Sequence, residues 1–461
     1  MKKKYSRSLF IFTRDLRLHD NTTLIELLKL SHDVIPVFIF NPVQLDDTNK
    51  YKSNNCVQFM CECLEDLNSQ LENHGSKLFL FYDDPIKLLN KIVQIEEIDC
   101  IGINKDYTPF AKKRENDIKK ICDQHQIDFV CMEDHMLTGI DKVMTDSASS
   151  YVKFTPYMNK AKKIKIRDDV KNNYKNYIQK NHKFTNQLTK LEFKKSLNYF
   201  YEANQNIWVR GGRTNGLKML SKISNQKKYN TSRNYPFENT TNLSAYMKFN
   251  VLSIREVYKK FSNVLGNKND LIKQLYWRDF YMNVMYHKNV IKTNMNGKNV
   301  NWKGTKSDLN KWKNGLTGFP LVDAGMRQLN QTGYMHNRVR MVVGSFLVKV
   351  LHIDWKEGEK YFASKLVDYD VANNNGGWQW VSGTGTDSQP YFRYLNPWSQ
   401  LEKYDKETKY VKAWIKELAD VPSKDICKWN QTYDNYKKTK YPAPIYDDVT
   451  ERVKSAIKMY K

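Results

Sequence analysis

Residues 367–383, VDYDVANNNGGWQWVSG, hold the side chains best suited to chemistry. The carboxylates of Asp368 and Asp370 could bind a metal, but no His or Cys lies close enough in the sequence to complete a ligand set. Gly376–Gly377 permits close backbone approach or a positive φ, and the two tryptophans that follow offer large flat π faces. This combination favours a planar, polar, buried ligand over a metal.

Two further segments carry groups that contact phosphates in proteins. RGGRTNG (210–216) lacks the GK[ST] ending of a nucleotide-triphosphate loop, so a structural turn is the better interpretation. TTNLSAY (240–246), which follows Tyr229 and Arg233, places three hydroxyls before an expected helix. Hydroxyls and free amides at a helix start can bind an anion. Helix capping explains one hydroxyl, and a phosphate ligand for the others stays open.

Two arginines lie in the segment MHNRVRMVVGSFLVKVL (335–351), which predicts a helix. Arg338 and Arg340 are two positions apart and therefore occupy different helix faces. One can face solvent or a phosphate, while the other turns inward and needs an acid. Asp368 is the candidate partner.

The elements that position these residues fall into two classes. In the first third, apolar runs alternate with helix-length segments, which predicts a parallel, doubly wound α/β sheet. No GxGxxG follows the first run, so a dinucleotide site of the usual kind is not supported. The loop TRDLRLHDNTTL follows instead, and its charges could hold a ligand or form exposed pairs. The expected strands are 8–12, 33–40, 77–82, 98–104 and 128–132, the expected helices lie near 22–31, 54–73, 85–95 and 110–124, and the loop charges are Arg14, Asp15, Arg17 and Asp20.

The α/β pattern covers residues 1–135. Residues 136–200 become rich in lysine and asparagine, which predicts an interdomain linker or a basic surface beside a polyanion. From 201 to 461 the apolar period is helical and predicts an all-α domain, with a helix over 321–333 that ends at Gly333. Within 271–287 the expected buried stripe comprises Tyr276, Trp277, Phe280, Tyr281 and Val284.

The net charge of +25 in 461 residues favours a polyanionic partner. Nucleic acid leads, because each phosphate neutralised releases counterions, and an aromatic content of 13% suits base stacking. A lysine- and asparagine-rich composition without such a partner is the alternative. The seven cysteines show no metal-ligand spacing, and no apolar run reaches signal or transmembrane length. These features predict a soluble intracellular protein with no metal and no membrane contact.

Long segments resemble the photolyase/cryptochrome family of flavoproteins, most of all its class I cyclobutane pyrimidine dimer photolyases. The resemblance covers nearly the whole chain and implies an α/β antenna domain over 1–135 and a helical FAD- and DNA-binding domain over 201–461. The matching segments, in the family order, are TRDLRLHDN, SYVKFTPY (150–157), LSAYMKFNVLSIREVY, YWRDFY, WKNGLTGFPLVDAGMRQLNQTGYMHNRVRM, HIDWKEGEKYF and LVDYDVANNNGGWQWVSGTGTDSQPYFRYLNPWSQ.

By this resemblance, residues 367–383 surround the isoalloxazine of a U-shaped FAD, and Asn374 faces its N5. A neutral amide there can accept the N5 hydrogen and favour reduced flavin. An asparagine resembles the repair enzymes more than the signalling cryptochromes. A second, antenna chromophore at 103–114 could be a folate, a deazaflavin or a flavin, or the site could be empty. The FAD-binding residues implied are Tyr229, Thr240, Thr241, Asn242, Leu243, Ser244, Arg278, Arg340, Asp368, Tyr369, Asp370 and Asn374.

The resemblance also implies an electron path and a DNA surface. Trp302, Trp355 and Trp378 match the three-tryptophan chain that photoreduces the flavin. Trp277 and Trp380 match the residues that flank a flipped-out dimer, whose extrusion costs about a few kcal/mol. The DNA-facing residues implied are Arg233, Gln274, Trp277, Arg278, Tyr281, Asn337, Arg338, Met341, Trp380 and Gln400.

The implied activity is that of a deoxyribodipyrimidine photo-lyase, acting as a monomer on UV-damaged DNA. Excited FADH⁻ donates an electron to a cyclobutane dimer, the ring splits and the electron returns. A (6-4) photolyase is disfavoured, because Asn337 and Met341 stand where that type uses histidines as acid and base. A cryptochrome-type blue-light receptor is the other alternative. Gln274 departs from the glutamate of most dimer photolyases of this group; its amide can bond a thymine carbonyl but cannot deliver a proton.

Overall fold

The computed structural model describes residues 3–184, 188, 190–191, 197–288, 293–297, 299–387 and 392–460. The chain forms two compact units. Unit 1 comprises Met1–Ala203, Val209–Lys227 and Thr241–Asn289, and unit 2 comprises Asn204–Trp208, Lys228–Thr240 and Val290–Lys461. These units divide the chain elsewhere than the predicted boundaries near 135 and 200, because several helices beyond 201 pack with the α/β part. Residues 388–391 of the motif GTGTDSQPYFRYLNPWSQ, and residues 185–187, 189 and 192–196 of the predicted linker, lie outside the described residues.

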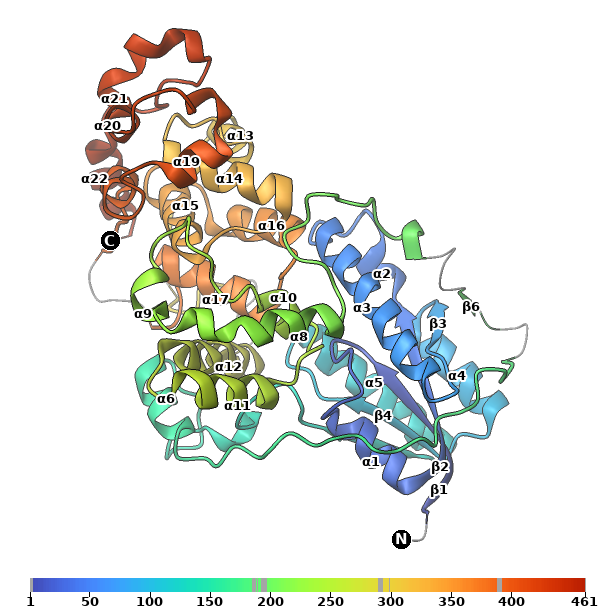
Figure 1. Ribbon diagram of the computed structural model, residues 1–461. Coiled ribbons are helices and arrows are strands. Elements are labelled where there is room, and N and C mark those ends of the chain that lie inside the picture. Colours follow the sequence, from blue (N-terminus) through green and yellow to red (C-terminus); the bar gives the residue numbers. More distant parts are fainter. Residues whose placement is uncertain are drawn as a thin grey trace. The chain divides into compact units, whose positions relative to one another are not determined.

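Unit 1 is built on a six-stranded sheet in the order β5-β4-β1-β2-β3-β6 (Figure 1). Strands β1 to β5 are parallel to their neighbours, and β6 pairs antiparallel with β3. The five predicted strands are confirmed within a few residues, whereas the two-residue β6 was missed because so short an element leaves no pattern. The strands are β1 (Tyr5–Phe12), β2 (Ser31–Phe40), β3 (Phe79–Tyr82), β4 (Cys100–Asn104), β5 (Asp128–Met132) and β6 (Lys190–Leu191).

Helices cover both faces of this sheet, as the doubly wound prediction requires. Leu9 and Ile11 of β1 share a buried cluster with residues of α4 (Pro85–Glu96) and α5 (Pro109–His125). On the opposite face, Gly102 of β4 lies against α1 (Thr22–Leu30), where an added Cβ would sit 2.4 Å from Leu27 Cδ1. The glycine therefore permits close packing of α1 on the sheet.

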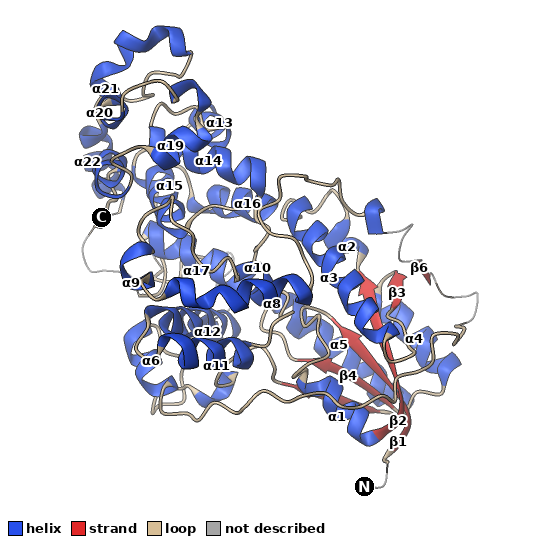
Figure 2. Cartoon of the chain, viewed as in Figure 1, coloured by secondary structure: helices blue, strands red, loops and turns tan. Residues whose placement is uncertain are grey.

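The rest of the described chain is mainly helical (Figure 2), and from residue 201 onward its described residues form no strand. The all-α prediction for this part is confirmed. The remaining helices of unit 1 are α2 (Pro42–Leu45), α3 (Asn54–Glu72), η1 (Ile140–Lys142), α6 (Phe154–Ala161), η2 (Leu197–Tyr199), α8 (Arg213–Ser221), η3 (Lys222–Gln226), α10 (Ser244–Lys248), α11 (Ile254–Leu265) and α12 (Asp270–Lys288). Those of unit 2 are α9 (Tyr229–Ser232), α13 (Lys306–Asn314), α14 (Pro320–Thr332), α15 (Asn337–Lys349), α16 (Trp355–Lys365), α17 (Val371–Ser382), α18 (Pro397–Tyr404), α19 (Lys409–Trp414), η4 (Lys416–Leu418), α20 (Ser423–Cys427), α21 (Trp429–Thr432), η5 (Tyr433–Thr439) and α22 (Val449–Met459).

The charged loop after β1 is buried, so the expectation of exposed ion pairs was wrong. Arg17 Nη2 lies 2.6 Å from Asp134 Oδ2, Asp20 Oδ2 lies 2.6 Å from Arg255 Nε, and Arg255 Nη2 lies 2.8 Å from Asp134 Oδ1. All four of these side chains are at most 4% exposed. The network joins the loop after β1, the segment after β5, and α11. The predicted loop charges are all buried: Arg14, Asp15, Arg17 and Asp20.

The RGGRTNG segment forms the start of α8, and its polar groups are occupied by acids of α3. The Gly211 N–H donates to Glu62 Oε2 over 2.5 Å, and the Arg213 N–H donates to Asp66 Oδ2 over 2.8 Å. A Cβ at Gly211 would lie 2.4 Å from the Phe59 carbonyl oxygen. The glycine therefore allows close approach of two backbones. These contacts support a structural role, although residues 213–216 form the first turn of α8 and not an isolated turn.

The predicted linker belongs to unit 1, and part of it packs on β2 and α12. Val34 of β2 and Tyr177 form a parallel bridge, and the Ile178 N–H donates to the Val34 carbonyl over 2.9 Å. Residues 154–161 form α6, which contacts α12. The sequence pattern did not predict the bridge or the helix, because their few buried residues are spread among exposed basic ones.

The predicted stripe on α12 is partly wrong. Tyr276, Phe280 and Val284 are buried, but Trp277 and Tyr281 are only half-buried. Helix α12 buries residues around most of its circumference, so apolar spacing alone does not separate its inner from its outer face.

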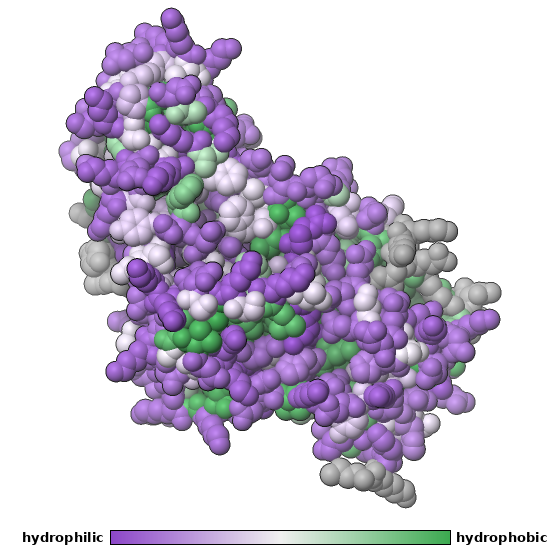
Figure 3. Space-filling model, in the orientation of Figure 1, coloured by the Kyte–Doolittle hydropathy of each residue, from purple (hydrophilic) through white to green (hydrophobic). Residues whose placement is uncertain are grey.

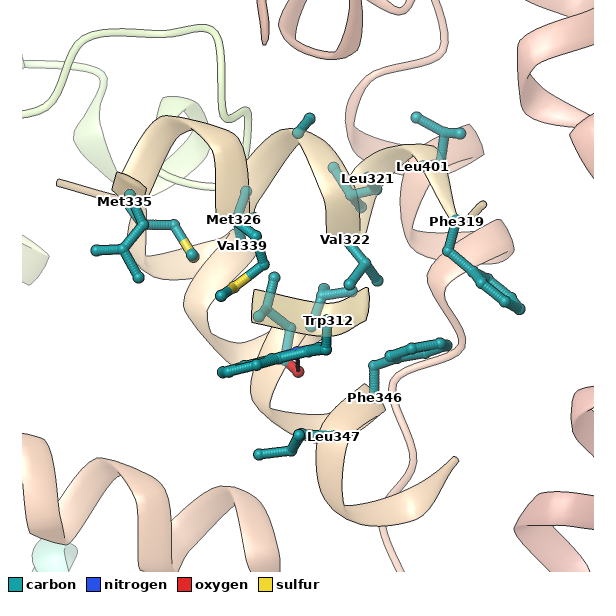
Figure 4. Close-up of a cluster of buried hydrophobic side chains, with 14 of the residues drawn as sticks. Trp312, Phe319, Leu321, Val322, Met326, Met335, Val339, Phe346, Leu347 and Leu401 are labelled. Atoms are coloured by element: carbon teal, nitrogen blue, oxygen red, sulfur yellow. Dashed lines mark hydrogen bonds between the residues drawn. The ribbon is translucent and has the colours of Figure 1, made fainter. Parts of the chain in front are cut away.

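A large apolar cluster of unit 2 lies around α14 and α15 (Figure 4). Trp312 and Phe346 lie within it, and Gly333 ends α14 with a φ of 69°, as predicted. None of the described helices is long and apolar enough to span a membrane. Hydrophilic side chains dominate the face seen in Figure 3, in keeping with a charged content of 27%.

A buried carboxylate ties the C-terminal part of unit 2 to α14. Asp323, fully buried, accepts hydrogen bonds from the Thr317 N–H (2.9 Å), the Thr317 hydroxyl (2.7 Å), the Gly318 N–H (2.8 Å) and the Tyr441 hydroxyl (2.6 Å). We expect Tyr441→Phe to lower the free energy of unfolding by about 2 kcal/mol, because a buried charge loses one donor. Urea unfolding would measure this. Tyr199→Phe, at a residue 80% exposed, is the control, and an equal effect of both variants would contradict the prediction.

Candidate functional site

The segment 367–383 forms the start and body of helix α17. Asp370 is its N-cap, and its carboxylate accepts from the Asn373 N–H over 2.9 Å. Neither Gly376 nor Gly377 has a positive φ, because both are helical, so of the two expected uses of this glycine pair only close backbone approach is left. A Cβ at Gly377 would meet no heavy atom within 4 Å. Open space therefore lies beside α17 about one turn from Asn374, which fits a planar ligand on this face.

The amide of Asn374 has a fixed orientation. Its Nδ2 donates to the Glu359 carbonyl over 3.0 Å and to Glu359 Oε1 over 3.1 Å. Glu359 is only 4% exposed. Reversing the amide would place its oxygen against two acceptors, so Oδ1 points away from Glu359. Within the described chain Oδ1 accepts no hydrogen bond, which suits it to accept the N5 hydrogen of a reduced flavin.

The predicted ion pair between Arg340 and Asp368 is confirmed. Arg340 Nη2 lies 3.0 Å from Asp368 Oδ2, and its Nε donates to the Met335 carbonyl over 2.7 Å. Arg338, on another face of α15, contacts Asn234 instead. The carboxylates of Asp368 and Asp370 are thus taken up by an arginine and a helix cap, which further weakens the metal interpretation.

The hydroxyls of TTNLSAY have few protein partners. Thr240 Oγ1 lies 3.4 Å from the Tyr334 hydroxyl, and Thr241 Oγ1 accepts from the Leu243 N–H over 3.4 Å. Ser244 begins α10 and is exposed. Helix capping by a side chain, the simpler interpretation, is absent at α10. Asn242 has a φ of 52°, a conformation that asparagine tolerates.

Arg278 of α12 is held inside unit 1. Its Nη1 donates to the His135 carbonyl over 2.6 Å and to Asp279 Oδ1 over 3.1 Å, and its Nη2 donates to Asn250 Oδ1 over 3.3 Å. Burial raises the pKa of Asp279 to about 6. Contact of Arg278 with FAD or DNA stays a prediction.

One face of Trp277 is covered within unit 1. Its ring stacks on Phe154 of α6 with centroids 3.7 Å apart and planes 6° apart, and Tyr281 lies at 5.6 Å. Gln274 precedes Trp277 by three residues, so both lie on one side of α12. Gln274 Nε2 donates to the Asp270 carbonyl over 3.4 Å, within the helix. Phe154 thus holds the indole in one plane.

The first turn of α15 presents two side chains that cannot exchange protons at neutral pH. Asn337 is exposed, and its Nδ2 lies 3.9 Å from Met341 Sδ, one turn further on. His336 is the N-cap, with Nδ1 accepting the Arg338 N–H over 3.1 Å. It is 3% exposed, and its buried Nε2 has no hydrogen-bond partner in the described chain.

The three tryptophans of the predicted electron path lie in or against the core of unit 2. Trp378 and Trp355 are buried in the apolar cluster, and Trp302 packs against it half-buried. Trp355 Nε1 donates to Asn294 Oδ1 over 2.8 Å. Gly358 lets α16 approach Trp378, since a Cβ there would sit 2.2 Å from the indole. The path stays a prediction.

The other predicted residues of unit 2 lie at polar surfaces or beside the core. The Arg393 guanidinium lies 4.8 Å from the Trp380 ring, and that of Arg233 lies 5.9 Å from Tyr229. Gln400 of α18 has a buried Oε1 without a hydrogen-bond partner in the described chain. Tyr369 packs against the apolar cluster.

Comparison with known proteins identifies the chain. Residues 8–173 match the DNA photolyase family model, and residues 271–461 match the FAD binding domain of DNA photolyase. A protein of Alkalihalophilus pseudofirmus named deoxyribodipyrimidine photo-lyase is 32% identical over 98% of this chain and 97% of its own length. The chain belongs to the DNA photolyase family. The predicted family, the photo-lyase enzyme class and the FAD cofactor are confirmed.

Solved structures of this family share the fold. An archaeal photolyase from Sulfolobus tokodaii, described with two FAD molecules, is 38% identical with a TM-score of 0.86, and the match covers 98% of this chain and 99% of that one. A Synechocystis cryptochrome is 26% identical with a TM-score of 0.89 over all of both chains. Photolyases and cryptochromes therefore have the same architecture, and subtype depends on individual residues.

Sequence reasoning missed three positioning residues. Glu359 lies fifteen residues before Asn374, and no local pattern links them. Phe154 lies in SYVKFTPY, whose apolar start to a helix was a usable signal. Arg393 carries no signal that separates it from other surface arginines.

We expect Glu359→Leu to lower the midpoint potential of the bound FAD. The Asn374 amide would keep the backbone carbonyl of residue 359 but lose the carboxylate acceptor. The less firmly held amide would stabilise the reduced form less well, and a loss of about 1 kcal/mol corresponds to about 20 mV for a two-electron couple. Spectroelectrochemistry would measure the shift. Glu357→Leu removes the same charge two residues away and serves as the control; matching potentials in the two variants would refute the positioning role.

We expect acid to destabilise the start of α15 because of its N-cap residue, His336. Burial lowers its pKa to about 4, and the charges of Arg340 and Arg338 act in the same direction. The pKa of histidine in the unfolded chain is about 6.5. The stabilisation by His336 is therefore complete above pH 6.5 and is lost as the pH falls toward 4. The loss in the free energy of unfolding reaches up to about 3 kcal/mol.

Unfolding free energies at pH 7.5 and 4.5 would test this. His336→Asn keeps an N-cap acceptor but cannot titrate, so the variant should lose less stability on acidification than the unmodified chain. Equal losses would show that His336 does not titrate as described.

Proposed function

We propose that this enzyme splits cyclobutane pyrimidine dimers in UV-damaged DNA under near-UV or blue light. The observation that carries the proposal is the first turn of α15, where Asn337 and Met341 lie side by side. Neither side chain can act as an acid or base, so the arrangement suits a reaction driven by electron transfer better than one that needs proton transfer to a (6-4) product.

When bound, reduced FAD supplies the light absorption and the electron. The residues of the chain bind and orient it: Asn374 Oδ1 would accept the N5 hydrogen, and the open space at Gly377 leaves room for the ring system. Trp378, Trp355 and Trp302 would carry electrons to an oxidised flavin. The further FAD contacts proposed are Tyr229, Thr240, Thr241, Asn242, Leu243, Ser244, Arg278, Arg340, Asp368, Tyr369 and Asp370.

DNA binding would be largely electrostatic. The net charge of +25 favours phosphates, and affinity should fall with salt by a slope near −0.9 per phosphate neutralised in duplex DNA. Trp277 and Trp380 offer aromatic faces to an extruded dimer, which offsets the cost of unstacking. The other DNA contacts proposed are Arg233, Gln274, Arg278, Tyr281, Asn337, Arg338, Met341 and Gln400.

A cryptochrome-type blue-light receptor is the second candidate, favoured by Gln274. An amide can hydrogen-bond a thymine carbonyl but carries no charge and delivers no proton, so repair would be less efficient than with a carboxylic acid. The antenna chromophore at 103–114, the monomeric state and the intracellular location stay predictions.

The first experiment uses the reduced protein with two oligonucleotides, one carrying a thymine cyclobutane dimer and the other a (6-4) product. We expect chromatography to show restoration of the cyclobutane substrate only, and only in light. Restoration of neither lesion by FAD-loaded, photoreducible protein would favour the receptor, and restoration of the (6-4) product would overturn the subtype.

Gln274→Glu should raise the yield of dimer repair, because the acid can hydrogen-bond and share a proton with the substrate. Lys273→Gln, which changes the net charge by the same −1 at the neighbouring position, serves as the control. An unchanged yield in Gln274→Glu would show that the glutamine does not limit repair.

A further inference from the structure

Segments far apart in the sequence meet at the loop between α15 and α16 of unit 2, residues 350–354, which we call the His352 loop. The His352 carbonyl accepts the Lys303 N–H over 3.1 Å and the Gly304 N–H over 2.9 Å. Its ring Nε2 lies 2.8 Å from the carbonyl oxygen of Arg452 in α22, and donates to it because a carbonyl can only accept. The His352 loop therefore joins the segment before α13 to α22.

His352 has an unusual backbone conformation that its contacts hold in place. Its φ is 58°, in the left-handed region that residues with a Cβ rarely adopt. The residue is 1% exposed, so its polar groups need protein partners. Arg452 Nε also donates to the Val350 carbonyl over 2.8 Å, which gives α22 a second attachment to the same loop.

Gly304 allows the segment before α13 to lie close against the His352 loop. A Cβ at this position would lie 2.3 Å from Ile353 Cγ1 and 2.6 Å from the Leu351 carbonyl oxygen. Alanine would therefore force the two segments apart, because a packed interior has no room for the added methyl group. The separation of the segments is set by the hydrogen bonds to His352 and by the missing side chain of Gly304.

Two tryptophans of the predicted electron path are attached to these segments. Trp302 directly precedes Lys303, and Trp355 directly follows the His352 loop. Trp355 is fully buried and Trp302 is half-buried, so Trp302 is the end nearer to solvent. The Trp302 ring meets the ring of Tyr460, the C-cap of α22, edge-on with centroids 6.0 Å apart. Helix α22 thus contacts Trp302 directly and also holds the loop that leads into Trp355.

We propose that the His352 loop positions Trp302 for electron transfer to Trp355, with α22 holding the loop in place. His352 is a positioning residue in this account, and the account rests on the proposed function. There, Trp355 gives an electron toward the flavin through Trp378 and regains one from Trp302, which a thiol in solution then reduces. Two such transfers and one proton reduce FAD to FADH⁻, while dithiothreitol gives up two electrons and two protons and becomes its disulfide.

Photoreduction of the FAD-loaded chain without DNA, followed by flavin absorbance in the presence of dithiothreitol, tests the proposal. His352→Asn keeps a residue that tolerates the left-handed backbone but is too short to reach Arg452. We expect it to slow photoreduction by about 3-fold or more, and Gly304→Ala by about 10-fold or more, since a misplacement of about 1 Å can cost up to about 100-fold in rate. Asn301→Ala, at an exposed residue on the other side of Trp302, is the control and should behave like the unmodified chain. Unchanged photoreduction in both variants would overturn the proposal.

Hydrogen exchange in the dark gives a readout that does not depend on flavin chemistry. The N–H groups of Lys303 and Gly304 donate to the His352 carbonyl, so they should exchange faster in His352→Asn than in the unmodified chain. Equal exchange of the segment in the two proteins would show that the His352 ring does not hold it, and would overturn the proposal.

A double variant separates positioning from a general loss of structure. Trp302→Phe removes the ring that the loop is proposed to position, so adding His352→Asn should slow the remaining photoreduction no further. An equal fold-loss in the two backgrounds would overturn the proposal. Normal photoreduction of Trp302→Phe alone would overturn the electron path and the proposal with it.

Dimer repair after chemical reduction distinguishes this proposal from the proposed function. Dithionite reduces FAD without the tryptophans, so His352→Asn treated in this way should repair a cyclobutane dimer like the unmodified chain. Absence of repair by the dithionite-reduced, unmodified chain, together with the expected losses of photoreduction, would overturn the repair activity and leave the role of the His352 loop standing. Normal repair by all proteins without those losses would overturn the role of the His352 loop alone.

Discussion

Four buried charges constrain how unit 1 can be built. Arg17, Asp134, Arg255 and Asp20 lie in alternating ion pairs of 2.6 to 2.8 Å away from water. Removing any one of them would leave the others uncompensated, at a cost of about 3–5 kcal/mol. Because Arg255 belongs to α11 and Asp134 follows β5, the network attaches the helices of unit 1 to its sheet.

The position of α12 follows from this attachment. Helix α12 packs against α11, and Arg278 donates to the carbonyl of His135, the residue after Asp134. Phe154 then fixes the plane of Trp277 by stacking on it. The side chains proposed to meet DNA in unit 1 are therefore placed by buried ion pairs, by hydrogen bonds and by one aromatic stack.

Unit 2 follows the same physical rule with different groups. Asp370 caps α17, Asp368 neutralises Arg340, and Glu359 engages the nitrogen of Asn374. Each of these buried polar groups has a protein partner, as desolvation requires. The amide oxygen of Asn374 accepts no hydrogen bond within the described chain. It is the atom suited to accept the N5 hydrogen of a reduced flavin. The Trp355 N–H likewise donates to Asn294, and the carbon faces of the tryptophans pack in or against the apolar cluster, where Gly358 allows the close packing.

The sequence by itself determined the strands and helices of the sheet, the family, and the ion pair that an inward-facing arginine needs. Alternating apolar runs identified the strands and helices of the sheet, because burial on two faces imposes a local period. The spacing of Arg338 and Arg340 was enough to infer that one turns inward to Asp368. Tertiary structure alone decided that the loop charges after β1 are buried. It also decided that the carboxylates of α3 accept hydrogen bonds from the backbone of RGGRTNG, and that Glu359 orients the amide of Asn374. Those partners are far apart along the chain, so only folding brings them together.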